Sequence, residues 1–131
     1  MLLMMVNTVQ SETQGNGLFG DMKHVRMIND MKEGVLVRLH CRSKNDDLGE
    51  RVLAFRQHWE WKFNDNVISS TLFWCNMHAN NVVRSFRVYF CDDDYLRCNT
   101  QCYRSLRMDG AYYYHQIRNV WQKQLSWIVD A

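Results

Sequence analysis

Proline is absent from the sequence, which removes turns built around a cis X–Pro bond from consideration. No apolar run approaches the length of about 18 residues that a membrane-spanning helix requires. The charges also lack a dominant sign, since 16 Lys and Arg residues stand against 14 Asp and Glu residues and leave a net charge of +2. Nucleic-acid-binding surfaces usually carry a strongly basic balance. We therefore expect neither nucleic-acid binding nor membrane insertion.

The chain has the size and composition of one folded domain. It contains 131 residues, and a domain of that size buries roughly two thirds of the surface that its unfolded chain exposes. The aromatic share is 13%, with five Trp residues. Because disordered chains are poor in aromatic residues, this composition indicates an ordered core.

The N-terminal segment differs from the rest of the chain. Residues 1–6 are apolar, but the run is shorter than the apolar region of a complete signal peptide, and no Lys or Arg precedes it. The following residues up to 22 are polar and aperiodic, which is typical of a flexible tail. We interpret residues 1–22 as a truncated secretion signal plus flexible tail and residues 23–131 as a single domain. A frayed apolar terminus on a cytosolic protein is the alternative.

Short strands are expected along most of the domain. Apolar and polar residues alternate over 35–41 and 58–63, which predicts half-buried strands there. The segment 71–77 is nearly all apolar and predicts a central strand covered on both faces. Turn signals recur at intervals of about ten residues, as in a sandwich or barrel. Further strands are expected over 25–28, 85–90, 102–107 and 111–115.

Two regions carry distinct signals for the connections. Asp109-Gly110 lies between two short strands and predicts a hairpin, and residues 43–49 are expected to form a turn. The tail over 117–129 has apolar residues near helical spacing, so that a terminal helix and a last strand both remain open. The predicted fold class is an all-β, antiparallel β-sandwich of about seven or eight short strands.

The five cysteines are numerous for a chain of this length. They are compatible with disulfides, metal ligands or buried thiols, and an odd number leaves one thiol unpaired within a monomer. Spacing alone does not choose the pairs. A bridge between Cys41 and Cys75 would close a long span and contribute on the order of 3–4 kcal/mol by the loop-entropy estimate.

Four separated segments carry a resemblance to a known family. They cover His24–Asn29, Leu39–Gly49, Ser70–Cys75, and Arg97-Cys98 through Cys102 to Asp109-Gly110. In this order and spacing they resemble the plant self-incompatibility S-protein homologues, which are related to the stigma determinant of poppy. The match covers about residues 24–115, and the His-Cys-Arg-Ser-Lys-Asn-Asp-Asp-Leu-Gly block is its most specific part.

The resemblance implies a secreted, extracellular β-sandwich that acts as a signalling ligand on a plant cell-surface receptor and is not an enzyme. It implies two disulfides among four family cysteines, here Cys41, Cys75, Cys98 and Cys102, in a pairing that stays open. Cys91 is then the odd, free cysteine. A monomer is expected, with a dimer linked through Cys91 as the alternative.

Metal and catalytic sites are weaker interpretations. His40 and Cys41 would point to opposite faces of a strand, which disfavours a zinc site, and the acidic runs at 46–47 and 92–94 lack an EF-hand pattern. No thiol or hydroxyl has a sequence neighbourhood that predicts a nucleophile. We expect no catalytic residue, no metal and no cofactor.

Loops are the expected binding surface, because a rigid sandwich usually presents its function there. The receptor-binding residues that we select are Asp65, Asn66, Asn80, Asn81, Asp93 and Asp94. Trp59, Trp61, Phe63 and Trp74 are instead assigned to the core.

A cluster of cations near the C-terminal end supports an alternative function. Residues 97–123 contain five basic residues and a single acidic one, Asp109. The basic residues are Arg97, Arg104, Arg107, Arg118 and Lys123. A basic face of this kind would suit an extracellular carbohydrate-binding or defence module. A solvated face without a ligand is the simpler interpretation.

Overall fold

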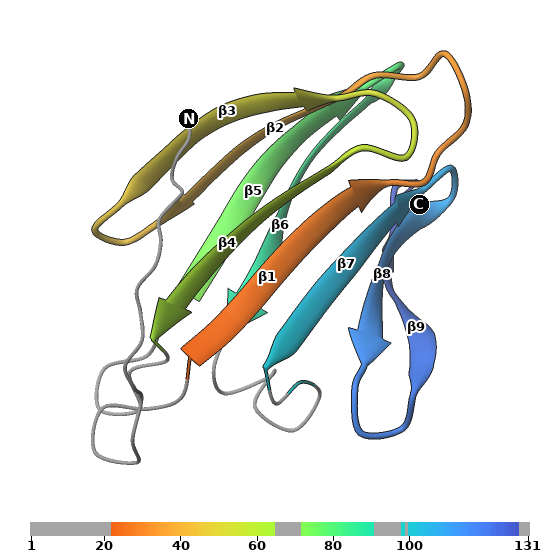
Figure 1. Cartoon of the computed structure of the whole chain (residues 1–131). Helices are drawn as coiled ribbons and strands as arrows, with labels where there is room; N and C mark the ends of the chain where they lie inside the picture. The colour runs from red at the N-terminus through yellow and green to blue at the C-terminus, as the bar shows by residue number, and fades with distance from the viewer. Residues whose placement is uncertain (1–21, 65–71, 91–97, 99, 129–131) are drawn as a thin grey trace.

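The computed structural model describes residues 22–64, 72–90, 98 and 100–128. These residues form two sheets that lie face to face (Figure 1). The five-stranded sheet has the order β4-β1-β7-β8-β9, and its strands are β1 (Met22–Asn29), β4 (His58–Asn64), β7 (Gln101–Arg107), β8 (Gly110–His115) and β9 (Val120–Ser126). The four-stranded sheet has the order β3-β2-β5-β6, and its strands are β2 (Val37–Ser43), β3 (Asp47–Leu53), β5 (Leu72–Ala79) and β6 (Val82–Phe90). The predicted all-β sandwich is confirmed.

The strand pairing departs from a wholly antiparallel arrangement at one place. β1 pairs with β4 antiparallel and with β7 in parallel, with Val25 opposite Trp61 on one side and opposite Cys102 on the other. A parallel pair requires a long crossover connection. Here the four-stranded sheet and β4 lie between β1 and β7 along the chain, so that the crossover spans most of the fold.

Nine strands are present in the described part of the chain, two of them in places where the sequence left them unassigned. β3 begins at Asp47, inside the segment 43–49 that was expected to be only a turn. Most of its residues are half-buried or exposed, so it lacks the apolar alternation that reveals a strand. The tail forms β9 instead of a helix, and Val120, Trp121 and Ile128 from its apparent apolar stripe are exposed.

The segment predicted to be covered on both faces is an ordinary half-buried strand. In β5, the residues Phe73, Cys75, Met77 and Ala79 are buried, whereas the residues between them are half-buried or exposed. That prediction was wrong, because Trp74 belongs to the outer face of the sheet and had been counted with the core. Trp59 and Trp61 are buried as expected, and Phe63 packs against the core.

The predicted hairpin exists, but its glycine serves a different purpose. The two turn residues are Met108 and Asp109, and Gly110 is already the first residue of β8, opposite Arg107. A Cβ atom at Gly110 would lie 2.1 Å from the carbonyl oxygen of Leu125 in β9. The glycine is therefore required by close strand contact and not by the turn.

A fully buried asparagine fixes the connection between the two sheets. The side-chain nitrogen of Asn29 donates to the carbonyl oxygens of Val35 and Leu53, at 2.8 and 2.9 Å. Its side-chain oxygen accepts from the backbone N–H of Met31 at 3.0 Å. All three bonds join the end of β1 to segments that lead into or out of the four-stranded sheet. This satisfies the polar groups of Asn29 in a position with no access to solvent.

Candidate functional site

Two disulfides join the four cysteines that the resemblance assigned to bridges. Cys41 in β2 is bonded to Cys75 in β5, and Cys98 is bonded to Cys102 at the start of β7. The first bridge closes a separation of 34 residues and the second a separation of 4. Both are buried, so they act as parts of the scaffold and are not presented to a partner. Cys91 lies outside the described residues.

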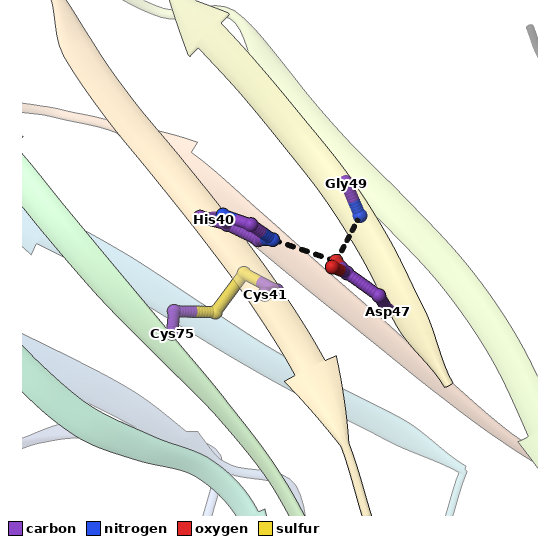
Figure 2. The surroundings of a disulfide bond; sticks show 5 residues. All are labelled: His40, Cys41, Asp47, Gly49 and Cys75. Atoms are coloured by element: carbon purple, nitrogen blue, oxygen red, sulfur yellow. Dashed lines mark hydrogen bonds and ion pairs between the residues drawn. A yellow bond between two sulfur atoms is a disulfide. The ribbon is translucent and has the colours of Figure 1, made fainter. Parts of the chain in front are cut away.

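The most specific sequence block builds a hairpin beside the first bridge (Figure 2). His40 and Asp47 face each other across β2 and β3, with the His40 Nε2 atom 2.6 Å from the Asp47 carboxylate. The same carboxylate accepts the backbone N–H of Gly49 at 2.9 Å. The pKa of Asp47 lies below its ordinary value, mainly because its carboxylate accepts the hydrogen bond from Gly49 and secondly because it is hydrogen-bonded to His40. Gly49 has a φ of 86°, a conformation that glycine adopts without strain.

Of the six loop residues selected from the sequence, the structure describes two. Asp65, Asn66, Asp93 and Asp94 lie outside the described residues. Asn80 and Asn81 form the tight turn between β5 and β6 and are exposed. Asn80 has a φ of 52°, in the left-handed region that asparagine tolerates better than other residues with a side chain. This turn therefore presents two amide side chains at one end of the four-stranded sheet.

Beside this turn lies an open hollow of about 200 Å³ on the outer face of the four-stranded sheet. It is lined by Leu36, Arg38, Val52, His78, Ala79 and Asn80. Two of these side chains are large, apolar and exposed, Leu36 at 58% and Val52 at 47%. Val83, opposite His78 and 77% exposed, extends the apolar surface onto β6. We call the lining residues together with Val83 the hollow surface.

Strand register explains why these residues meet. Val52 lies opposite Arg38, Arg38 opposite His78, and His78 opposite Val83, so one row crosses all four strands from β3 to β6. Arg38 is weakly paired, with its Nε atom 4.0 Å from the Glu50 carboxylate and both side chains more than half exposed. The row thus offers apolar groups at its two ends and a guanidinium near its centre.

Of the hollow surface, sequence reasoning selected Asn80 and missed the rest. Its residues come from four strands and from the segment before β2, and their contact depends on pairing between distant parts of the chain. A local signal did exist for β2 and β5, because alternation places Arg38 and His78 on the outward side. β3 carried no comparable signal, so that Val52 was not recognised.

The basic face expected near the C-terminal end does not form as a continuous surface. Arg104 is only 2% exposed, and its guanidinium lies against the Tyr113 ring at 5.7 Å. It faces inward because it alternates with Cys102 and Leu106 in β7. Lys123 is paired with Asp109 at 3.0 Å, and Arg97 lies outside the described residues. The prediction of a basic face that includes Arg104 was wrong.

A group of ionisable side chains occupies the outer face of β1 and β4. The Glu60 carboxylate is 2.6 Å from His24 Nε2, 3.2 Å from His58 Nε2 and 3.4 Å from Arg26 Nε. Burial raises the pKa of Glu60, but the neighbouring His24, Arg26 and His58 outweigh it, and the pKa lies below its ordinary value. This arrangement holds the two strands together by cross-strand charge pairing.

No three His, Cys, Asp or Glu side chains within the described residues are grouped so as to hold a metal ion. The same part of the chain contains no helix that is long and apolar enough to cross a membrane.

Comparison with known proteins gives consistent matches. The model of the plant self-incompatibility protein S1 family matches residues 24–127. S-protein homolog 1 of Arabidopsis thaliana is 38% identical over 91 residues, which cover 67% of this chain and 60% of that protein. S-protein homolog 3 of the same plant is 32% identical over 101 residues, which cover 77% of this chain and 67% of that protein. The chain thus aligns with about two thirds of the length of these relatives.

A solved structure shows the same fold. It is that of a self-incompatibility protein homologue, from a family described as small, highly stable, secreted proteins from plants. The TM-score is 0.58 at 20% sequence identity, and the match covers 84% of this chain and 91% of the solved one. At this level of identity the likeness concerns the sandwich architecture.

Proposed function

Because this chain belongs to the plant self-incompatibility protein S1 family, we propose that it is a secreted, non-enzymatic signalling ligand that acts through a receptor on a plant cell surface. Secretion is supported by the description of the structurally similar homologue as a secreted protein. Two buried disulfides support it further, because such bonds persist in oxidising compartments outside the cell. Membership in this family supports the non-enzymatic part of the proposal.

The hollow surface is the observation that carries the receptor proposal. It combines exposed Leu36, Val52 and Val83 with the turn residue Asn80, which was selected for receptor binding from the sequence. Exposed apolar groups rimmed by polar ones mark interaction sites, and rigid strands hold them in place. A complementary receptor segment would insert an apolar side chain and place a carboxylate near Arg38, which its weak pairing with Glu50 leaves accessible.

The experiment that tests this function measures binding of the labelled protein to the surface of plant cells. Saturable binding that unlabelled protein competes away, and that protease treatment of the cells abolishes, is the expected result. Binding that does not saturate, or that survives protease treatment, would contradict a protein receptor. Cells from several tissues are compared, because the binding also shows in which tissue the protein acts.

A second experiment tests secretion and thiol state together. The protein secreted by plant cells should have lost an N-terminal segment, and alkylation should label one thiol before reduction and five after it. The one thiol would be Cys91 in a monomer with two bridges. An uncleaved intracellular product with five free thiols would contradict secretion, and a product of twice the mass before reduction would indicate a dimer linked through Cys91.

A further inference from the structure

A row of aromatic and basic residues crosses the outer face of the five-stranded sheet. Glu60 in β4 lies opposite Arg26 in β1, and Arg26 lies opposite Tyr103 in β7. On the far side, Tyr114 in β8 lies opposite Trp121 in β9. Tyr103 and Tyr114 join the two halves through stacked rings whose centroids are 6.5 Å apart. Figure 1 shows these five strands side by side, so that the row runs across the whole sheet.

The members of this row contact one another in sequence. The guanidinium of Arg26 lies 4.6 Å from the centroid of the Tyr103 ring. The Tyr114 and Trp121 rings are 5.3 Å apart, and Trp121 is 40% exposed. The hydroxyl of Tyr114 donates to the side chain of Asn119, which fixes the ring in place. The row is therefore a preformed ridge of ring and guanidinium planes.

Beside this row lies the cationic side chain of Arg107, which its neighbours fix in place. Its guanidinium lies 4.2 Å from the centroid of Tyr112 and 5.5 Å from that of Trp121. Its Nε atom donates to Ser105 Oγ at 3.0 Å, and that hydroxyl in turn donates to Asp30 at 2.5 Å. No Asp or Glu within the described ranges forms an ion pair with Arg107. A guanidinium that is stacked on an aromatic ring still has N–H donors at its edge. Such donors can bind a carboxylate through two parallel hydrogen bonds.

The charge on this face favours an anionic ligand. The outward Lys and Arg residues of its five strands are Arg26, Lys62, Arg107 and Lys123, whereas Glu60 is the outward carboxylate on the same strands. Asp109 in the β7–β8 turn accepts a hydrogen bond from Tyr112 and pairs with Lys123. Glu60 is likewise engaged by Arg26 and two histidines. Both carboxylates thus have a cation as direct partner, whereas Arg107 is linked to the Asp30 carboxylate only through the hydroxyl of Ser105.

We propose that this face binds a linear polysaccharide that carries carboxylates, with sugar rings packed on Tyr114 and Trp121 and a uronate carboxylate bound to Arg107. Sugar rings present C–H groups that pack against the electron-rich faces of aromatic rings. The polymer runs along the row across the strands and passes Arg26, which is paired with Glu60 and stacked on Tyr103. The hollow surface that we assign to a protein receptor lies on the opposite sheet. The polysaccharide site is independent of the receptor proposal.

The test measures binding of polygalacturonate to the intact secreted protein, with the fully methyl-esterified polymer for comparison. We expect saturable, salt-sensitive binding of polygalacturonate, and weaker binding of the ester, which lacks the negative charges. Arg107→Gln and Trp121→Ala should each weaken the binding by about tenfold. Their matched controls are Arg38→Gln and Trp74→Ala on the outer face of the four-stranded sheet, which should bind polygalacturonate as the unmodified protein does.

Several results would overturn this inference. Absence of binding, or equal binding of the esterified polymer, would remove the anionic ligand. Unchanged binding by Arg107→Gln and Trp121→Ala would remove the site, and an equal loss with Arg38→Gln would reveal a non-specific charge effect. If Trp121→Ala abolished cell-surface binding that protease destroys, the face would be a protein interface instead. Thermal unfolding of each variant separates these outcomes from loss of the fold.

Discussion

Cys41 lies directly opposite Cys75 in the antiparallel pairing of β2 with β5, and a disulfide joins the two residues in the core. The hairpin of β2 and β3 on one side of the bridge and the hairpin of β5 and β6 on the other carry the residues of the hollow surface. Because the bridge holds these two hairpins in fixed register, it supports the surface that we assign to receptor binding without contacting a partner itself.

Replacement of this bridge by Cys41→Ala and Cys75→Ala together should lower the free energy of unfolding by about 3–4 kcal/mol, since the closed span is long. The bridge between Cys98 and Cys102 closes only a short span. Its removal by Cys98→Ala and Cys102→Ala should therefore lower the free energy of unfolding by about 2 kcal/mol. Urea unfolding of both double variants measures the two losses. A larger loss from the short bridge would contradict the loop-closure account.

Asn29→Ala should destabilise the fold by about 2–3 kcal/mol, because it leaves buried backbone groups of Val35, Leu53 and Met31 without their partners. Asn45→Ala in the exposed β2–β3 turn is a suitable control and should have little effect. Denaturant unfolding provides the comparison. Equal midpoints for the two variants would show that the three hydrogen bonds do not brace the sheets.

Gly110→Ala should also destabilise the protein, because the added Cβ would overlap the Leu125 carbonyl and push β9 away from β8. The expected loss is about 2 kcal/mol or more, in the range of backbone overpacking. The control, Gly34→Ala, has open space around its Cβ, although its φ of 90° still brings some strain. Denaturant unfolding of the two variants is the measurement, and we expect the lower midpoint for Gly110→Ala.

The stability of the β2–β3 hairpin should fall in acid. The pKa of Asp47 is lowered in the folded protein from 3.8, so folding favours the charged carboxylate, and its stabilising effect is complete above pH 3.8. It is lost as the pH falls through the lower folded value. Asp47→Asn should therefore flatten the dependence of the unfolding free energy on pH below this point. NMR titration of the Asp47 carboxyl gives the folded pKa, and a value at or above 3.8 would contradict the expectation.

The fold could be predicted from the sequence where alternation was strong. The inward residues of β1, β4 and β7 follow the period of two, and the same rule applied to Arg104 would have placed it with Cys102 and Leu106 inside. β3 escaped detection because an edge strand with few buried residues has no clear apolar pattern. The parallel pairing of β1 with β7 leaves no local trace, since parallel partners are joined by distant parts of the chain.

The candidate sites were less predictable for the same reason. Asn80 and Asn81 carry a turn signal that local sequence reveals, whereas the row Val52, Arg38, His78 and Val83 depends on the register of four strands. The row of Tyr103, Tyr114 and Trp121 depends on β9, which had competed with a helix in the sequence. Exposed apolar side chains at strand positions are informative only once the pairing shows that they are neighbours.

The most direct measurement of the central claim is the dissociation constant of the labelled protein on receptive plant cells for the unmodified chain and three variants. Val52→Asp places a charge in the hollow, and Asn80→Gly removes an amide while keeping the φ of 52° accessible. Ile117→Asp alters an apolar residue next to the five-stranded sheet that is more exposed than Val52, 68% against 47%, and serves as the control. We expect Val52→Asp and Asn80→Gly to bind at least about tenfold more weakly and Ile117→Asp to bind normally. Unchanged binding by the two hollow variants, with the fold intact, would contradict the assignment of receptor binding to this surface.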